Sequence, residues 1–310
     1  MRPHVELIQQ ADLVWHDAEL PFGDGRAVQR NLSYCEELGA GSFRVRFDGP
    51  WVRPAGYHSA DTEWFVLAGE VRLGDTILVP GSYFRAPAGL WIPQISAREG
   101  SEVLLYREYG DWGFTRADRP KPGFISRGGN TASKDLGELT VIHTARMQWQ
   151  EKKEEDFAMT HGTEGWPQGN LRHKWLYRDP APEGDPTKGF GALLCWAPPG
   201  WSDTRLMHHP VFEEAYTLDG AMDYNFGVLK VGTYFFRPAR VKHGHFLAGA
   251  EKGTVLLIRV DGQLINWASL DAHVEMHATP VNYDPRTEGP VPAGLPVRSR
   301  STGHWHMDGW

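Results

Sequence analysis

Short hydrophobic segments separated by glycine and proline make up most of this chain. Residues 44–47 read Arg-Val-Arg-Phe, residues 64–67 read Trp-Phe-Val-Leu and residues 76–79 read Thr-Ile-Leu-Val. Runs this short and this rich in β-branched and aromatic residues favour strands, and the 35 Gly and 22 Pro favour frequent turns. The pattern predicts an all-β protein with antiparallel sheets, of the sandwich or barrel kind.

Helical periodicity is scarce along the chain. Residues 147–158 are compatible with a short helix, but the charge run from Glu151 to Asp156 equally fits a solvated loop. Further strands are expected at residues 103–107, 139–149, 171–177, 189–196 and 255–260.

An internal repeat is the strongest architectural signal in the sequence. Glycine, tyrosine, proline and histidine residues recur 151 positions apart, as Gly69/Gly220, Gly81/Gly232, Tyr83/Tyr234, Pro87/Pro238 and His58/His209. Self-similarity at one fixed offset predicts a duplicated barrel. Gly, Pro, Arg and Asp collect within residues 110–130, so we expect the join there. The expected domains are 1–125 and 126–277, followed by an irregular Pro- and Gly-rich tail at 278–310.

Composition narrows the class of protein without identifying a function. The net charge of −7, with no basic stripe, argues against a nucleic-acid partner. Two cysteines, Cys35 and Cys195, are too few for a disulfide scaffold, so a reducing cytoplasm is expected. The first residues lack the apolar core of a signal peptide, and no apolar run is long enough to span a membrane.

Three candidate metal ligands lie in the second half of the chain. His209 is followed four residues later by Glu213, and His243 lies about thirty residues further on. In a barrel, alternate residues of each strand face inward, so ligands from several strands can meet at the barrel mouth. Imidazole suits Zn, Cu, Fe and Ni, and two His with one carboxylate and open positions favours non-haem Fe(II).

The same stretch resembles the paired motifs of the cupin superfamily, and is most similar to its ChrR-like and acetylacetone-cleaving branch. The residues that carry the resemblance are His209, Glu213 and Gly220, then Gly232, Pro238 and His243, with Ala-Pro-Pro-Gly-Trp at 197–201 before them. The resemblance implies two tandem cupin barrels, each a double-stranded β-helix or jelly roll. It also implies a homodimer, because cupin strands and tails often bury exposed edges across a two-fold axis.

This sequence departs from the cupin pattern at two positions. Met207 stands where the first His of a His-x-His pair is usual, and Arg240 replaces the usual Gly, which we expect to alter the turn before His243. A β-bulge would let His208 act as the missing fourth ligand.

The first half of the chain keeps only part of this motif. At the 151-residue offset, Thr62 stands opposite Glu213 and Ile92 opposite His243, while Glu63 is one place out of register. One His and a displaced carboxylate rarely hold a metal. We therefore expect the first barrel to serve as a structural partner, with a degenerate metal site.

Other polar residues near the motif have two interpretations each. Arg205 shares strand parity with Met207 and His209, so it either faces the barrel and holds an anionic oxygen or forms a salt bridge at the rim. His245 shares strand parity with His243, so it either faces the cavity or packs elsewhere.

The leading functional hypothesis is a metal-dependent bicupin enzyme, an Fe(II) dioxygenase in which Glu213 and Arg205 are the candidate catalytic residues. The resemblance implies O2 and a small β-diketone or hydroxyaryl ketone as substrates, with cleavage of a C–C bond. A redox-neutral cupin isomerase, lyase or decarboxylase using Mn, Ni or Zn is a second hypothesis. A ChrR-like small-molecule sensor without catalysis is a third.

Overall fold

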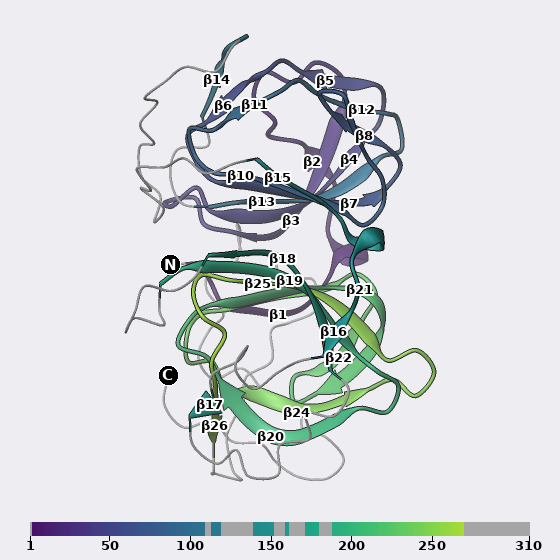
Figure 1. Cartoon of the computed structure of the whole chain (residues 1–310), viewed down its shortest axis with the longest axis vertical. Helices are drawn as coiled ribbons and strands as arrows, with labels where there is room; N and C mark the ends of the chain where they lie inside the picture. Colours follow the sequence, from purple (N-terminus) through teal and green to yellow (C-terminus); the bar gives the residue numbers. More distant parts are fainter. Residues whose placement is uncertain are drawn as a thin grey trace. The chain divides into compact units, whose positions relative to one another are not determined.

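The chain is built from short strands joined by tight turns (Figure 1). The computed structural model describes residues 2–108, 113–118, 139–151, 159–160, 171–179 and 188–269, and only the backbone of residues 159–160, 204–205, 245 and 267–269. The described residues form strands and two 3₁₀ turns and no α-helix, which confirms the all-β fold class. Of the residues considered for a short helix, 147–149 are not helical and 150–151 form a strand, while 152–158 lie outside the described residues. No helix in the described part could cross a membrane.

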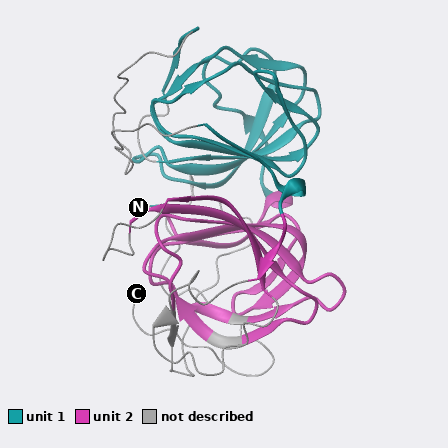
Figure 2. Ribbon diagram, in the orientation of Figure 1, with its two compact units in different colours: residues 1–2, 13–147, 284–287 teal, residues 3–12, 148–283, 288–310 magenta. Residues whose placement is uncertain are grey.

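Two compact units divide the chain (Figure 2). The first contains the described residues from Leu13 to Met147, and the second contains Pro3–Asp12 and the described residues from Gln148 onward. The sequence places the boundary at 125/126, which lies outside the described residues.

The first unit has one seven-stranded sheet and two smaller ones. The large sheet runs in the order β15 (Thr140–His143), β10 (Ser82–Ala86), β7 (Thr62–Ala68), β13 (Glu102–Arg107), β4 (Gly41–Phe47), β3 (Ala27–Tyr34), β2 (His16–Asp17). The smaller sheets are β5 (Trp51–Arg53), β12 (Ile95–Ala97), β8 (Val71–Leu73), β9 (Thr76–Leu78), and β11 (Trp91–Ile92), β6 (Gly56–His58), β14 (Phe114–Arg116).

The second unit is a twelve-stranded sheet that closes around an apolar interior. Its main path is β16 (Gln150–Glu151), β18 (Arg172–Asp179), β19 (Phe190–Ala197), β25 (Thr254–Val260), β21 (Glu213–Tyr224), β24 (His243–Ala248), β20 (Ser202–His208), β26 (Asn266–Ser269), β17 (Met159–Thr160). Off this path, β22 (Gly227–Lys230) pairs with β21, and β23 (Thr233–Arg237) pairs with β21 and with β1 (Val5–Gln9).

In each unit, one strand comes from a part of the sequence that is expected in the other domain. Residues 139–149 are expected to open the second barrel, but β15 pairs antiparallel with β10 in the first unit. In the same way β1, from the start of the chain, pairs with β23 in the second unit. A 3₁₀ turn follows each strand, and its first N–H donates to an equivalent glycine: Gln10 to the Gly232 carbonyl at 3.0 Å and Thr144 to the Gly81 carbonyl at 3.2 Å.

Backbone geometry repeats at the 151-residue offset. The turn glycines Gly69 and Gly220 have φ of 74° and 71°. A β-carbon at Gly220 would collide with the Gly253 carbonyl, so glycine is required there.

Arg240 keeps the conformation of the glycine that it replaces. Its φ of 72° matches the 79° of its counterpart Gly89. The N–H of Arg240 donates to the His209 carbonyl at 2.8 Å, as Gly89 does to the His58 carbonyl at 2.8 Å. The expectation that Arg240 alters this turn is therefore wrong, because the hydrogen bond holds the left-handed backbone despite its cost of about 1–2 kcal/mol.

The interiors of the two units differ in the size of their side chains. In the first, Trp64 and Phe84 face each other across β7 and β10 with ring centroids 5.4 Å apart. The equivalent pair in the second unit is Ala215 and Phe235. The exchange of Trp for Ala removes an indole ring from the core of the second unit, which contains a cavity.

Candidate metal centre

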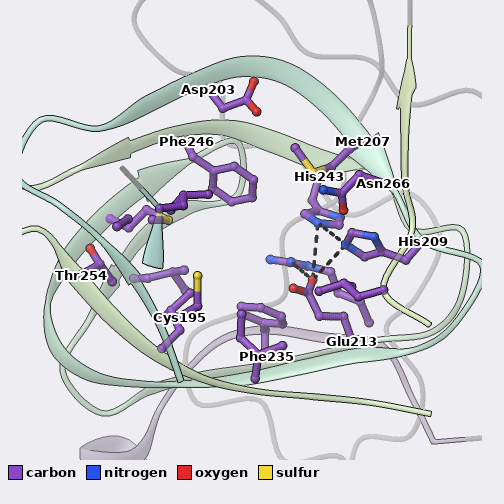
Figure 3. Close-up of a pocket in the computed structure, with 18 of the residues that line it drawn as sticks. Cys195, Asp203, Met207, His209, Glu213, Phe235, His243, Phe246, Thr254 and Asn266 are labelled. Carbon is purple, nitrogen blue, oxygen red and sulfur yellow. Dashed lines mark hydrogen bonds and ion pairs between the residues drawn. The ribbon is translucent and has the colours of Figure 1, made fainter. Parts of the chain in front are cut away.

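Three buried side chains converge at one end of the cavity in the second unit (Figure 3). His209 directly follows β20, Glu213 is the first residue of β21, and His243 is the first residue of β24. Their exposed fractions are 4%, 7% and 1%. Because all three lie where strands begin or end, the sheet fixes their backbones and the side chains meet at the barrel mouth.

The spacing of the three ligand atoms fits one bound cation. His209 Nε2 lies 3.2 Å from His243 Nε2, and Glu213 Oε2 lies 3.6 Å from His209 Nε2 and 3.4 Å from His243 Nε2. Two ligand atoms about 2.1 Å from one ion lie roughly 3.0 Å apart at a right angle and roughly 3.4 Å apart at a tetrahedral angle. The observed distances match these values within a few tenths of an ångström.

Hydrogen bonds to backbone carbonyls fix the tautomer of both imidazoles. His209 Nδ1 lies 2.9 Å from the Ile265 carbonyl oxygen, and His243 Nδ1 lies 3.0 Å from the Val241 carbonyl oxygen. A carbonyl oxygen only accepts, so each Nδ1 carries the proton and each Nε2 presents a lone pair. Two lone pairs 3.2 Å apart repel each other, and a cation between them removes that repulsion. Such bonds behind a ligating His are typical of metal sites.

Burial keeps the site in the protonation state that a metal needs. Burial, followed by the positive charge of Arg237, lowers the pKa of His243 well below its ordinary value of 6.5. Burial alone would raise the pKa of Glu213, but the neighbouring imidazole of His209 and the other charges around it bring it well below 4.5. At neutral pH the site therefore offers one carboxylate and a neutral His243.

Arg237 and Glu6 support the carboxylate from behind, and the sequence gives little sign of either. Arg237 Nη1 donates to Glu213 Oε2 at 2.9 Å, and Arg237 Nε donates to Glu6 Oε1 at 2.6 Å. Tyr224 donates its hydroxyl to Glu6 Oε2 at 2.6 Å. Strand register could have indicated Arg237, because it pairs directly with Glu213, but Glu6 comes from β1, over two hundred residues away.

The cavity beside the three ligands is small and largely apolar. It measures about 100 Å³. Its wall consists of aliphatic, aromatic and sulfur side chains, including Leu193, Cys195, Trp201, Met222, Phe235, Phe246, Leu256 and Ile258. Figure 3 places Asp203 and Thr254 away from the His–Glu group, and Asn266 beside it. A ligand held at the metal position would therefore have a polar, chelating end and an apolar body.

One family model covers residues in both units. A family model described as a domain of unknown function, DUF4437, matches residues 6–267. The chain belongs to the DUF4437 family. No curated protein is similar enough to this DUF4437 chain to count as a relative.

Solved structures similar to this DUF4437 chain are cupin-fold proteins. A candidate dioxygenase from Nostoc punctiforme is 21% identical with a TM-score of 0.61, over 85% of this chain and 80% of that one. YlbA from Escherichia coli is 15% identical with a TM-score of 0.54, over 83% and 90% of the two chains. A variant of oxalate decarboxylase from Bacillus subtilis is 13% identical with a TM-score of 0.50, over 84% and 78%. At these identities the likeness shows the fold: tandem cupin jelly-roll barrels.

The structure does not bring His208 to the ligand group of the DUF4437 site. β20 does carry a bulge, but it lies between Asp203 and Leu206, so Met207 lines the cavity opposite His243. His208 is partly exposed and does not line the cavity. Strand alternation explains this outcome, because adjacent residues point to opposite faces.

Two further candidates for the cavity wall are Arg205 and His245. The side chains of Arg205 and His245 lie outside the described part, so their roles stay predictions. Among the described residues, only His209, Glu213 and His243 form a group of three potential ligands. The described part of the first unit contains no such group, and its degenerate metal site stays a prediction.

Acid should destabilise the second unit of the DUF4437 chain through Glu6. Burial raises the pKa of Glu6, but Arg237 and then His4 lower it more, and the net value lies below 4.5. As pH falls, the unfolded chain therefore binds this proton first. The stability from Glu6 is present above about pH 4.5 and is lost as pH falls through the lower, folded value.

Denaturant unfolding between pH 7 and pH 3 measures this effect. The wild type should lose stability below pH 4.5 more steeply than Glu6→Gln. Parallel profiles for the two proteins would show that Glu6 is not held as a paired carboxylate.

Proposed function

We propose that this chain is a metal-dependent bicupin enzyme, a non-haem Fe(II) dioxygenase that cleaves a C–C bond in a small β-diketone or hydroxyaryl ketone. One observation carries the proposal. Two buried imidazoles, whose Nε2 atoms each have a free lone pair, converge with one carboxylate beside an apolar cavity. This donor set with open positions is the arrangement used by Fe(II) oxygenases. The candidate dioxygenase among the similar structures agrees with it but shares only the fold.

Charge balance favours a substrate that binds as a monoanion. Within the ligand group, Glu6 and Arg237 neutralise each other and Glu213 leaves one negative charge; Asp203 lies on the cavity wall away from this group. A divalent cation would bring the net charge to one positive. In an apolar cavity, a bound monoanion cancels this positive charge, whereas a bound dianion leaves one uncompensated negative charge. The enolate of a β-diketone or the phenolate of an ortho-hydroxyaryl ketone has one negative charge and two oxygens, three carbons apart, that can chelate one ion.

In this proposal, side chains of the protein hold the metal ion, orient its carboxylate ligand and exclude water from the cavity. His209, Glu213 and His243 hold the ion, which when bound supplies Lewis-acid and O2-reducing chemistry. Arg237 holds Glu213 ionised and in one orientation, and the lowered pKa of Glu213 suits a ligand better than a general base. Phe235 and Phe246 form part of the apolar wall that excludes water. Arg205 stays a candidate for binding an anionic oxygen.

An oxygen-uptake assay tests the reaction type. The protein is loaded anaerobically with Fe(II), Mn(II), Ni(II) or Zn(II) and given a panel of 1,3-diketones and hydroxyaryl ketones. We expect O2 consumption only with Fe(II), with one atom from ¹⁸O2 in each cleavage product. Full turnover without O2 would instead identify a redox-neutral cupin. Ligand binding without turnover under any condition would identify a sensor.

Metal removal should lower the stability of the second unit. Binding to the folded state alone adds about 3 kcal/mol when the free metal is 100-fold above its Kd. We expect chelation to lower the melting temperature of the wild type and of His58→Gln, but not of His209→Gln. Equal responses in all three proteins would contradict a site at His209. The homodimer, the cytoplasmic location and the lack of a nucleic-acid partner remain parts of the proposal.

A further inference from the structure

Asn266 places a neutral amide beside the three candidate metal ligands. It is the first residue of β26, its side chain is 5% exposed, and it lines the cavity of the second unit. Figure 3 shows the amide next to His243, whereas Asp203 and Thr254 lie farther from the His–Glu group. Asn266 is therefore a polar part of the cavity wall at the metal end.

Strand pairing fixes Asn266 on the same side of the sheet as a ligand. β26 pairs antiparallel with β20, with Met207 opposite Ala268 and His208 opposite Trp267. One step further in this register places Asn266 opposite His209, and directly opposite residues of an antiparallel pair share one face. The carbonyl before Asn266, that of Ile265, also accepts from His209 Nδ1 at 2.9 Å. The backbone of Asn266 is thus tied to the ligand group.

The amide of Asn266 has unused hydrogen-bonding capacity. Within the described part of the chain, no group donates to it or accepts from it. Neighbouring donors are engaged elsewhere, because both His Nδ1 atoms donate to backbone carbonyls and Arg237 donates to Glu6 and Glu213. A buried amide without a partner costs free energy, so a ligand in the cavity that supplies one gains affinity.

We propose that Asn266 Nδ2 donates a hydrogen bond to one oxygen of a small monoanion that chelates the metal through two oxygens. The assignment rests on the proposed function and deepens it. The Glu213 carboxylate only accepts, and the two Nε2 lone pairs face the ion position, so the amide supplies a donor for a negative oxygen there. Hydrogen bonds to charged oxygens are the stronger kind. Asn266 therefore selects a deprotonated, oxygen-chelating ligand without adding charge to the site.

Calorimetric titration of the Zn(II)-loaded protein tests this assignment. Zn(II) suits these ligands and is not redox-active, so binding is measured without turnover. The probes are acetylacetone and acetohydroxamate, each of which chelates as a monoanion through two oxygens. Asn266→Leu should raise the Kd of both probes by at least about 10-fold, because one hydrogen bond to a charged group is lost. It should leave the Kd for Zn(II) at the wild-type value.

Two further variants complete the set. Asn266→Asp keeps the size of the side chain but adds a negative charge beside the anion, so its probe Kd should rise further than that of Asn266→Leu. Gln94→Leu, which removes an exposed amide from the first unit, should match the wild type. Unchanged probe affinity in Asn266→Leu overturns the proposal. Weaker Zn(II) binding in this variant, with normal probe affinity once Zn(II) is saturating, overturns it in favour of a metal ligand.

A crystal structure of the wild type with Zn(II) and acetohydroxamate gives a readout that needs no variant to fold. We expect Asn266 Nδ2 about 2.7–3.2 Å from one oxygen of the chelator. Asn266-dependent binding of acetohydroxamate without binding of acetylacetone would remove the diketone substrate class and keep the role of Asn266. Failure of the wild type to bind either probe would overturn both.

Discussion

Replacement of Glu213 by Gln should weaken metal binding by more than about 100-fold and abolish metal-dependent turnover. Loss of an outer residue that orients a ligand typically costs about 10–100-fold in affinity, and removal of the ligand itself should cost more. The fold should survive, because Arg237 keeps its paired contacts with Glu6. The metal-to-protein ratio after desalting and the Kd from competition with a chelator measure the effect.

Glu251→Gln is the matched control for this substitution. Glu251 is exposed and lies in the turn before β25, so its loss should change neither the metal ratio nor the Kd. A wild-type Kd for Glu213→Gln would show that the carboxylate does not hold the ion.

Arg237→Met should be the most destabilising single change near the site. It removes the counter-charge of Glu6 and Glu213, two carboxylates buried at 0% and 7% exposure. Breaking one partner of a buried pair costs about 3–5 kcal/mol, because the other charge stays buried. Urea unfolding measures this loss, and Arg240→Met, which removes an exposed arginine three residues away, should lose much less.

A double-mutant cycle separates the pair from general damage to the core. Glu6→Gln in the Arg237→Met background removes one unpaired carboxylate, so the double variant should regain part of the lost stability. Additive losses in the two single variants would show that Glu6 and Arg237 are not coupled. Metal affinity should fall about 10–100-fold in either single variant, because Glu213 loses its fixed orientation.

Much of the metal centre could be predicted because its ligands lie in short sequence motifs. His209 and Glu213 lie four residues apart beside one turn, and the glycine and proline frame repeats 151 positions away. The expectation of His208 as a fourth ligand differs from the structure, because adjacent residues on a strand face opposite ways and the bulge of β20 lies before Leu206. The structure brings the three proposed ligands together.

The features that could not be predicted depend on contacts between distant segments. Nothing near Glu6 indicates that β1 would pair with β23, and nothing near residues 139–149 indicates that they pair with β10. Arg240 shows the opposite limit. An arginine in place of glycine predicts a different turn. Arg240 nevertheless has a glycine-like φ, because its N–H donates to the His209 carbonyl and holds the backbone in that conformation.

The two barrels share one fold but differ in their core residues and in the charged group beside the equivalent histidine. The first barrel places Trp64 in its core where the second has Ala215, and a guanidinium beside His58 where the second has a carboxylate beside His209. The Trp64 ring fills space in the core of the first unit, and the second unit, with Ala215 at the equivalent position, contains a cavity.

Anomalous diffraction at the iron edge, from crystals loaded with Fe(II) without oxygen, tests the central claim most directly. The account predicts one peak per chain, about 2.0–2.2 Å from His209 Nε2, His243 Nε2 and a Glu213 carboxylate oxygen. No peak there, or a peak bound by other residues, would contradict it.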